Sequence, residues 1–301
     1  MTNMILTAVL VLGAIGVIFA IVLYFVAQKF KVLEDPLIDE VAEVLPGANC
    51  GGCGKAGCRA MAEAFVKQGN MDGLKCPAGG EEVAKKVAAL LGCTPEVSDP
   101  MVAVLRCNGS CANANAKNNY DGLADCAFAN SVYAGESGCM FGCLGLGNCA
   151  KACQFGALSI DPATGLPVVD DDKCTACGAC VKACPRGLIE LRKKGVKNRR
   201  VYVACRNKEK GAVARKACSA ACIGCGKCER TCPFGAIKVE NNLAYIDFNL
   251  CRLCRKCVAE CPTGAIHAVN FPPLPPKKEA APEATSTPAA EPAKAAATQA
   301  V

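Results

Sequence analysis

The stretches CIGCGKCERTCP (222–233) and CRLCRKCVAECP (251–262) decide the fold, because each holds four cysteines spaced Cys-x2-Cys-x2-Cys-x3-Cys and followed by proline. The same spacing recurs in CTACGACVKACP (174–185). Three thiolates this close together can bind three corners of one [4Fe–4S] cluster, while the fourth cysteine belongs to the other cluster of a pair. A zinc site usually uses two separated Cys-x2-Cys pairs instead. The spacing therefore predicts paired iron–sulfur clusters rather than zinc.

This exchange of ligands predicts the cluster assignment in the last third of the chain. One cluster is expected to be held by Cys222, Cys225, Cys228 and Cys261. Its partner is expected to be held by Cys251, Cys254, Cys257 and Cys232. The crossing ties both halves into one bacterial-ferredoxin-like module of the βαββαβ type.

An internal repeat indicates that the chain holds two such modules. CMFGCLGLGNCAKACQFGAL (139–158) aligns with CSAACIGCGKCERTCPFGAI (218–237), and a second cysteine motif follows each copy. Asp170 and Asp247 stand four residues before those second motifs. We therefore expect an α+β chain with two tandem ferredoxin-like modules.

The first module departs from the motif. Leu146 stands where the aligned copy has Cys225, and Gln154 stands where it has Pro233. Cys139 is the natural replacement ligand. One cluster is therefore predicted to use Cys139, Cys143, Cys149 and Cys184. The other is predicted to use Cys174, Cys177, Cys180 and Cys153.

A different motif lies upstream, in ANCGGCGKAGC (48–58) and CPAGG (76–80). Its predicted cluster ligands are Cys50, Cys53, Cys58 and Cys76. Glycines between 47 and 57 let the backbone approach sulfide closely, and N–H···S bonds tune the reduction potential. We expect a small four-cysteine [4Fe–4S] domain, with one helix after Cys58 and another over 81–92 that stops at Gly92.

Six cysteines remain outside these five predicted clusters. The equivalent segments VAVLRCNG (102–109) and RVYVACRN (200–207) each carry one of them. Our hypothesis is a sixth cluster that joins the two modules, held by Cys107, Cys126, Cys205 and Cys218. The alternative is that these are buried free thiols, which are common. Cys93 and Cys111 stay unassigned.

The N-terminal run from Met4 to Ala27 has 24 residues and no charge. At the rise of an α-helix it spans about 36 Å, enough to cross a bilayer. A cleaved signal peptide is the alternative, but the run is too long and no basic residue precedes it. Because Lys29 and Lys31 follow the run, the positive-inside rule places the cluster domains in the cytoplasm.

Composition narrows the choice of cofactor. The chain of 301 residues has 26 cysteines but one histidine, His267. A single histidine excludes two-histidine zinc fingers and Rieske ligation, and the lack of Cys-x-x-Cys-His argues against c-type haem. Soft thiolates suit iron–sulfur clusters. The reducing cytoplasm also disfavours the alternative of a secreted disulfide protein.

The expected domain boundaries follow from these motifs. They are 1–31 for the membrane anchor, 32–92 for the four-cysteine domain, 93–198 and 199–271 for the two modules, and 272–301 for a tail rich in Pro and Ala. The tail lacks aromatic residues after Phe271, so we expect it to be disordered.

The basic stretch RKKGVKNRR (192–200) predicts a solvated hairpin, with a docking face for an acidic electron carrier as the alternative.

The order of the apolar helix, the four-cysteine motif and the ferredoxin-type motifs along the chain resembles that of the B subunit of the Rnf complex. This complex is an ion-translocating ferredoxin:NAD⁺ oxidoreductase of bacterial inner membranes. The resemblance rests on the helix at 4–27, EDPLIDEVAEVLPGANCGGCGKAGC (34–58), CPAGG (76–80) and the four ferredoxin-type motifs of a long form. It implies that the chain accepts electrons from reduced ferredoxin. It also implies that the chain passes them to flavin-bearing and NAD(H)-binding membrane subunits, which couple the reaction to Na⁺ or H⁺ movement.

Other features limit the role of this chain. No G-x-G-x-x-G follows a strand and opens a helix, so no NAD site or catalytic residue is expected here. The apolar run has no charge, so we expect no ion path through it. No segment is available for a DNA-binding domain. The alternative function is an electron-transfer subunit of another membrane dehydrogenase or hydrogenase.

Overall fold

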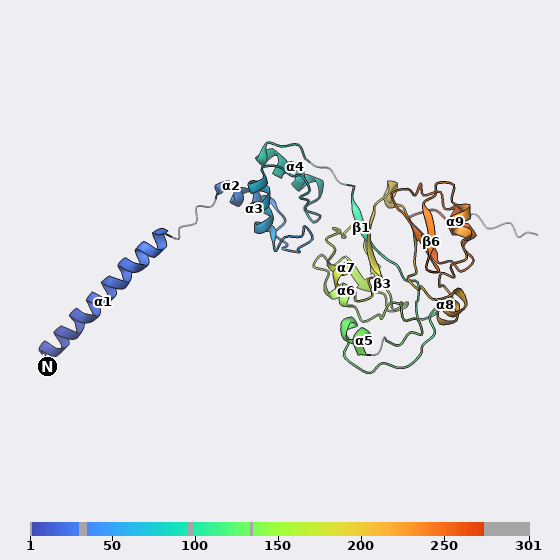
Figure 1. Ribbon diagram of the computed structural model, residues 1–301, viewed down its shortest axis with the longest axis horizontal. Coiled ribbons are helices and arrows are strands. Elements are labelled where there is room, and N and C mark those ends of the chain that lie inside the picture. The colour runs from blue at the N-terminus through green and yellow to red at the C-terminus, as the bar shows by residue number, and fades with distance from the viewer. Residues whose placement is uncertain (1, 30–34, 96–98, 133–134, 274–301) are drawn as a thin grey trace, which may run out of the picture. The chain divides into compact units, whose positions relative to one another are not determined.

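The structure is a computed structural model that describes residues 2–29, 35–95, 99–132 and 135–273 (Figure 1). The predicted boundary at 31–32, Lys31, and the tail beyond 273 lie outside the described residues. The first element is α1 (Thr2–Lys29), an apolar helix. Within the described part of the chain, its segment Ile5–Lys29 is the one helix long and apolar enough to cross a membrane.

The four-cysteine part is helical. It contains α2 (Pro36–Val44), α3 (Cys58–Gln68) and α4 (Gly80–Leu91). The side chain of Asp35 accepts a hydrogen bond from the amide of Leu37 (3.0 Å) and caps α2. The helices predicted after Cys58 and before Gly92 are confirmed, and Gly92 ends α4 in the left-handed conformation. Their apolar faces form a core around Val41, Met61, Phe65 and Val87.

The first module follows the four-cysteine part. Its elements are β1 (Met101–Leu105), α5 (Cys126–Val132), α6 (Asn148–Lys151), β2 (Leu158–Ile160), β3 (Pro167–Val169), α7 (Ala179–Ala183) and β4 (Ile189–Lys193). The outer strands β1 and β4 pair antiparallel, and so do the inner strands β2 and β3.

The second module repeats this order after the short 3-10 helix η1 (Val196–Asn198). Its elements are β5 (Arg200–Val203), α8 (Gly211–Ala217), α9 (Lys227–Thr231), β6 (Ile237–Glu240), β7 (Leu243–Ile246), α10 (Lys256–Glu260) and β8 (Ile266–Val269). Again the outer strands β5 and β8 pair, as do β6 and β7. The sequence repeat is therefore a structural repeat, with α5 and α8 added to the predicted order of elements.

A buried charge cluster joins the two modules. Arg192 on β4 is 1% exposed, and its Nε lies 2.9 Å from Oε1 of Glu190. Glu190 also pairs with the buried Arg106 at 3.1 Å, and it accepts a hydrogen bond from the Tyr245 hydroxyl of the second module. The Arg192 guanidinium lies over the rings of Tyr202 and Tyr245, also of the second module.

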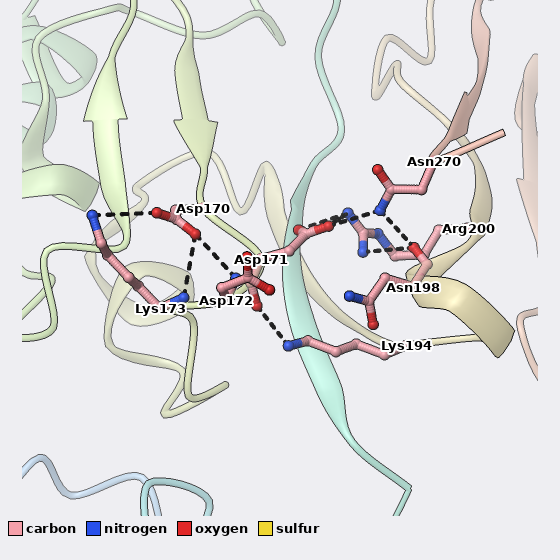
Figure 2. A network of polar contacts seen from close by, with 8 residues as sticks. All are labelled: Asp170, Asp171, Asp172, Lys173, Lys194, Asn198, Arg200 and Asn270. Carbon is pink, nitrogen blue, oxygen red and sulfur yellow. Dashed lines mark hydrogen bonds and ion pairs between the residues drawn. The ribbon is translucent and has the colours of Figure 1, made fainter. Parts of the chain in front are cut away.

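Figure 2 shows a second connection between the modules, centred on Asp171. Its two carboxylate oxygens accept hydrogen bonds from Nη2 of Arg200 at 2.8 and 2.9 Å. Nδ2 of Asn270 donates to the same carboxylate (3.0 Å), and Nζ of Lys194 donates to the Asp171 carbonyl (2.6 Å). The turn that precedes Cys174 is thereby attached to β5 and to the residue after β8.

The prediction of a solvated hairpin over 192–200 is wrong, because β4 pairs with β1 and β5 pairs with β8 rather than with each other. The alternative of a docking face also needs a correction. Arg192 and Arg200 are buried, and their charges are matched inside the protein by Glu190 and Asp171. These two arginines therefore cannot form part of a docking face.

The Asp171 connection yields a stability prediction. Asp171→Asn is expected to destabilise the protein by about 2 kcal/mol, because hydrogen bonds to charged groups contribute roughly 1.5–3 kcal/mol. The matched control is Asp172→Asn, since Asp172 is the exposed neighbour. Anaerobic thermal melting compares them. Equal melting temperatures of the two variants would contradict the role given to Asp171.

Candidate metal centres

Four short helices, α6, α7, α9 and α10, build the cysteine motifs of the modules. Each places one buried cysteine in its first turn, namely Cys149, Cys180, Cys228 and Cys257. The residue before each helix has a positive φ, and it is glycine before α6, α7 and α9 but Arg255 before α10. This left-handed turn, which favours glycine, lets cysteines before and inside the helix face one cavity.

The four-cysteine part brings its predicted ligands together. Cys50, Cys53, Cys58 and Cys76 line one pocket. The side chain of Asn49 accepts a hydrogen bond from the Cys58 amide (2.8 Å) and so holds the loop against the start of α3. Burial raises the pKa of the Cys76 thiol, and the nearby Cys58 and Cys53 act in the same direction.

The second module has the predicted crossed arrangement of thiols. One pocket is lined by Cys222, Cys225, Cys228 and Cys261. Another is lined by Cys232, Cys251, Cys254 and Cys257. In each case the fourth cysteine comes from the neighbouring motif, because the residue directly after each short helix turns away in an extended conformation.

The first module brings together one of its two predicted sets. Cys180 is surrounded by Cys174, Cys177 and Cys153. It also packs in one buried cluster with Cys149 of the neighbouring set. Two groups of thiols therefore lie side by side in this module, as in the second.

The structure brings together three members of the other predicted set of the first module, but not Cys139. The pocket there is lined by Cys126, Cys143, Cys149 and Cys184, and Cys139 is not among the lining residues. Cys126 begins α5, and its amide donates to Oδ1 of Asn148 on α6 (3.1 Å). Nζ of Lys151 donates to the carbonyl of Ala124 (3.1 Å). Contacts from α6 thus hold Cys126 where Leu146 cannot supply a thiol.

Cys139 instead faces a pocket between the modules. This pocket is lined by Cys107, Cys139, Cys205 and Cys218. The hypothesis for a sixth cluster grouped Cys126 with three of these thiols, so Cys126 and Cys139 exchange places between prediction and structure. A signal in the sequence could have shown this: Cys139 aligns with Cys218, and both open the two repeat copies.

The two cysteines left unassigned line none of these pockets. The Cys111 side chain is exposed, and its thiol donates to the carbonyl of Thr164 (3.6 Å). Cys93 packs against the helical core of the four-cysteine part.

Four thiols of these sites are held protonated when no metal is bound. Burial, followed by the neighbouring thiols, raises the pKa of Cys180 and Cys257 to about 12 and that of Cys228 to about 11. Burial likewise raises the pKa of Cys143 to about 12. Because the thiolate is the metal ligand, metal binding must release these protons.

The pockets fit a cluster held by four cysteines. Among the described residues, no three Cys, His, Asp or Glu side chains converge closely enough to hold a single metal ion. The thiols instead line pockets with volumes of about 320 to 400 Å³, counted together with their openings to solvent. A [4Fe–4S] cluster held by four thiolates is a group of this kind.

Comparisons with known proteins agree with this chemistry. A family model for a "4Fe-4S dicluster domain" matches residues 137–188, 173–236 and 221–265. A model for a "Putative Fe-S cluster" matches residues 45–78.

Three relatives match most of the chain. The B subunit of the Na⁺-translocating ferredoxin:NAD⁺ oxidoreductase complex of Acetobacterium woodii is 45% identical over 84% of this chain and 74% of its own length. This chain belongs to that B-subunit family. The proton-translocating counterpart of Clostridium ljungdahlii is 45% identical over 83% of this chain and 86% of its own length. The B subunit of the ion-translocating oxidoreductase complex of Methanosarcina acetivorans is 44% identical over 83% of this chain and 93% of its own length.

Membership of the B-subunit family gives the chain an electron-transfer role in an oxidoreductase complex. The resemblance stated from the motifs is confirmed. As a member of this family, the chain carries iron–sulfur domains over both the four-cysteine part and the modules.

Proposed function

We propose that this chain accepts electrons from reduced ferredoxin and relays them through [4Fe–4S] clusters to membrane partners that reduce NAD⁺. The observation that carries the proposal is that predicted ligands far apart in sequence, such as Cys222 and Cys261, line the same pocket. The names of the two bacterial relatives, both ferredoxin:NAD⁺ oxidoreductases, support the electron donor and acceptor. One is named as Na⁺-translocating and the other as proton-translocating.

Five clusters follow from the grouping of thiols. Their proposed ligands are Cys50, Cys53, Cys58 and Cys76; Cys126, Cys143, Cys149 and Cys184; Cys153, Cys174, Cys177 and Cys180; Cys222, Cys225, Cys228 and Cys261; and Cys232, Cys251, Cys254 and Cys257. When bound, such clusters supply one-electron redox chemistry at potentials that the protein tunes. The chain itself binds them, buries their thiolates and donates amide hydrogen bonds to sulfur.

The architecture supports two ferredoxin-like modules of the βαββαβ type, over 93–198 and 199–271, after a four-cysteine domain over 32–92. Each module pairs its first strand with its last, so the two ends of a module close on each other. Helix α1 is proposed to cross the inner membrane once, and Lys29 at its end favours the cytoplasm for the cluster domains.

Anaerobic co-purification through a tag on this chain tests the function. We expect recovery of flavin-bearing and multispanning membrane partners, together with ferredoxin-dependent NAD⁺ reduction. In that complex, Cys254→Ser is expected to lower the rate by about 10-fold or more, because even outer-shell changes at metal sites have effects of this size. Cys111→Ser is the matched control and is expected to keep the rate. Recovery of a hydrogenase in place of these partners would refute the proposal.

A further inference from the structure

We propose that Cys107, Cys139, Cys205 and Cys218 bind a further [4Fe–4S] cluster, which bridges the two modules. The inference rests on the proposed function, since it assumes that the neighbouring thiol sets also hold clusters. It names a ligand set that differs from the one expected from the sequence.

The first argument is the pocket itself. The four thiols belong to residues that are 6 to 9% exposed, and they line one space of about 340 Å³, its open side included. Gly109 also lines it, and a Cβ placed there would lie 3.5 Å from Sγ of Cys107 and 3.8 Å from Sγ of Cys218. The backbone thus closes over the sulfurs. Four buried thiols that line one pocket would gain packing contacts with a group bound between them.

The second argument is symmetry. Each module contributes two cysteines, and they occupy equivalent places in the repeat. Cys107 and Cys205 follow the first strands β1 and β5, while Cys139 and Cys218 open the two aligned copies. A site built from matching positions of two repeats has one ligand pair per repeat, which completes the four thiolates that a cluster requires.

The hydrogen bonds to sulfur repeat in the same way. The amide of Gly109 donates to Sγ of Cys107 (3.4 Å), and the amide of Asn207 donates to Sγ of Cys205 (3.5 Å). Asn207 is the residue that aligns with Gly109. Amides that point at sulfur stabilise thiolates and tune clusters. The backbone is therefore arranged for negatively charged sulfur on both sides of the pocket.

Backbone pairing between the modules positions the ligands. Ala114 forms an isolated antiparallel bridge with Cys218. On one side of it, the amide of Asn115 donates to the Ala217 carbonyl (3.2 Å). On the other, the amide of Ser219 donates to the Asn113 carbonyl (2.9 Å). Residues 113–115 of the first module thus hold Cys218, a proposed ligand from the second module, in place.

The site lies between two sets already proposed. The amide of Cys143, a ligand in the first module, donates to Sγ of Cys107 (3.4 Å). The backbone of Cys222, a proposed ligand in the second module, likewise lies next to the thiol of Cys205. A cluster here would therefore have one neighbouring cluster in each module.

Iron content of the anaerobically purified chain tests the assignment. Six clusters correspond to about 24 iron atoms per chain, and the double variant Cys139→Ser/Cys218→Ser is expected to hold about 20. Two ligands are replaced because one serine can still support a partial cluster. The control is Cys93→Ser/Cys111→Ser, which is expected to keep about 24. Spin counting of the fully reduced protein by EPR should show the loss of one cluster from six.

The possible outcomes separate the proposals. About 20 iron atoms in the unmodified chain would refute the sixth cluster, and this readout does not depend on the folding of a variant. About 16 in the double variant would place Cys139 and Cys218 in different clusters, which would refute the ligand set. Little iron, or zinc in its place, in the unmodified chain would refute the proposed function itself.

Discussion

Removal of iron and sulfide under anaerobic conditions is expected to abolish the cooperative thermal transition of residues 99–270. Every sheet among the described residues has two strands, and isolated two-stranded pairs are marginal in water. One apolar cluster of the first module consists of five buried residues, and two of them are the proposed ligands Cys149 and Cys180. We therefore expect bound clusters to substitute for a conventional core, since structural metal sites contribute on the order of 10 kcal/mol to folding.

Circular dichroism and hydrogen exchange measure this loss. The four-cysteine part has its own apolar core of nine buried residues, so amides such as those of Met61 and Phe65 should keep more protection than those of β1 and β5. Restoring iron and sulfide is expected to bring the transition back. An iron-free chain that melts at the temperature of the loaded chain would show that the modules fold without clusters.

Glu190→Ala is expected to destabilise the two modules by about 3 kcal/mol, because breaking a buried ion pair leaves an uncompensated charge. Glu190 is the partner of both Arg106 and Arg192, whose side chains are 8% and 2% exposed. We place the effect at the low end of the range because the Glu190 side chain itself is 22% exposed. Such a loss corresponds to a fall in melting temperature of roughly 6–12 °C.

The matched control is Glu240→Ala, at an exposed carboxylate on β6. It should leave the melting temperature within about 1–2 °C. Adding Arg192→Met to Glu190→Ala should recover part of the loss, since it removes one of the two unmatched charges. Equal effects of Glu190→Ala and Glu240→Ala would contradict the role given to the charge cluster.

Prediction from the sequence was most reliable where the pattern is local. The three closely spaced cysteines of a motif must face one space because a short helix follows a tight turn, as at Gly226 and Cys228. The crossing to Cys261 could also be predicted, since the motif implies a paired neighbour. The helices after Cys58 and over 81–92 could also be predicted, the second with its stop at Gly92.

The exchange of Cys126 and Cys139 could not be predicted with the same rule. The position of Cys126 depends on the contact between the start of α5 and Asn148 of α6, and the local spacing of cysteines does not encode that contact. The basic stretch 192–200 was misjudged for a similar reason, because Arg192 and Arg200 are buried. Arg192 pairs with Glu190 on its own strand, whereas Arg200 pairs with Asp171, 29 residues away.

The sequence by itself determined the cofactor chemistry, the apolar helix and the repeat, because thiolate spacing and apolar length act over a few residues. Only the tertiary structure decided which thiols share a pocket between the modules and which arginines are buried. These depend on contacts between residues far apart in the chain, as between Cys107 and Cys218 or Asp171 and Arg200. Such contacts exist only once the two modules have packed together.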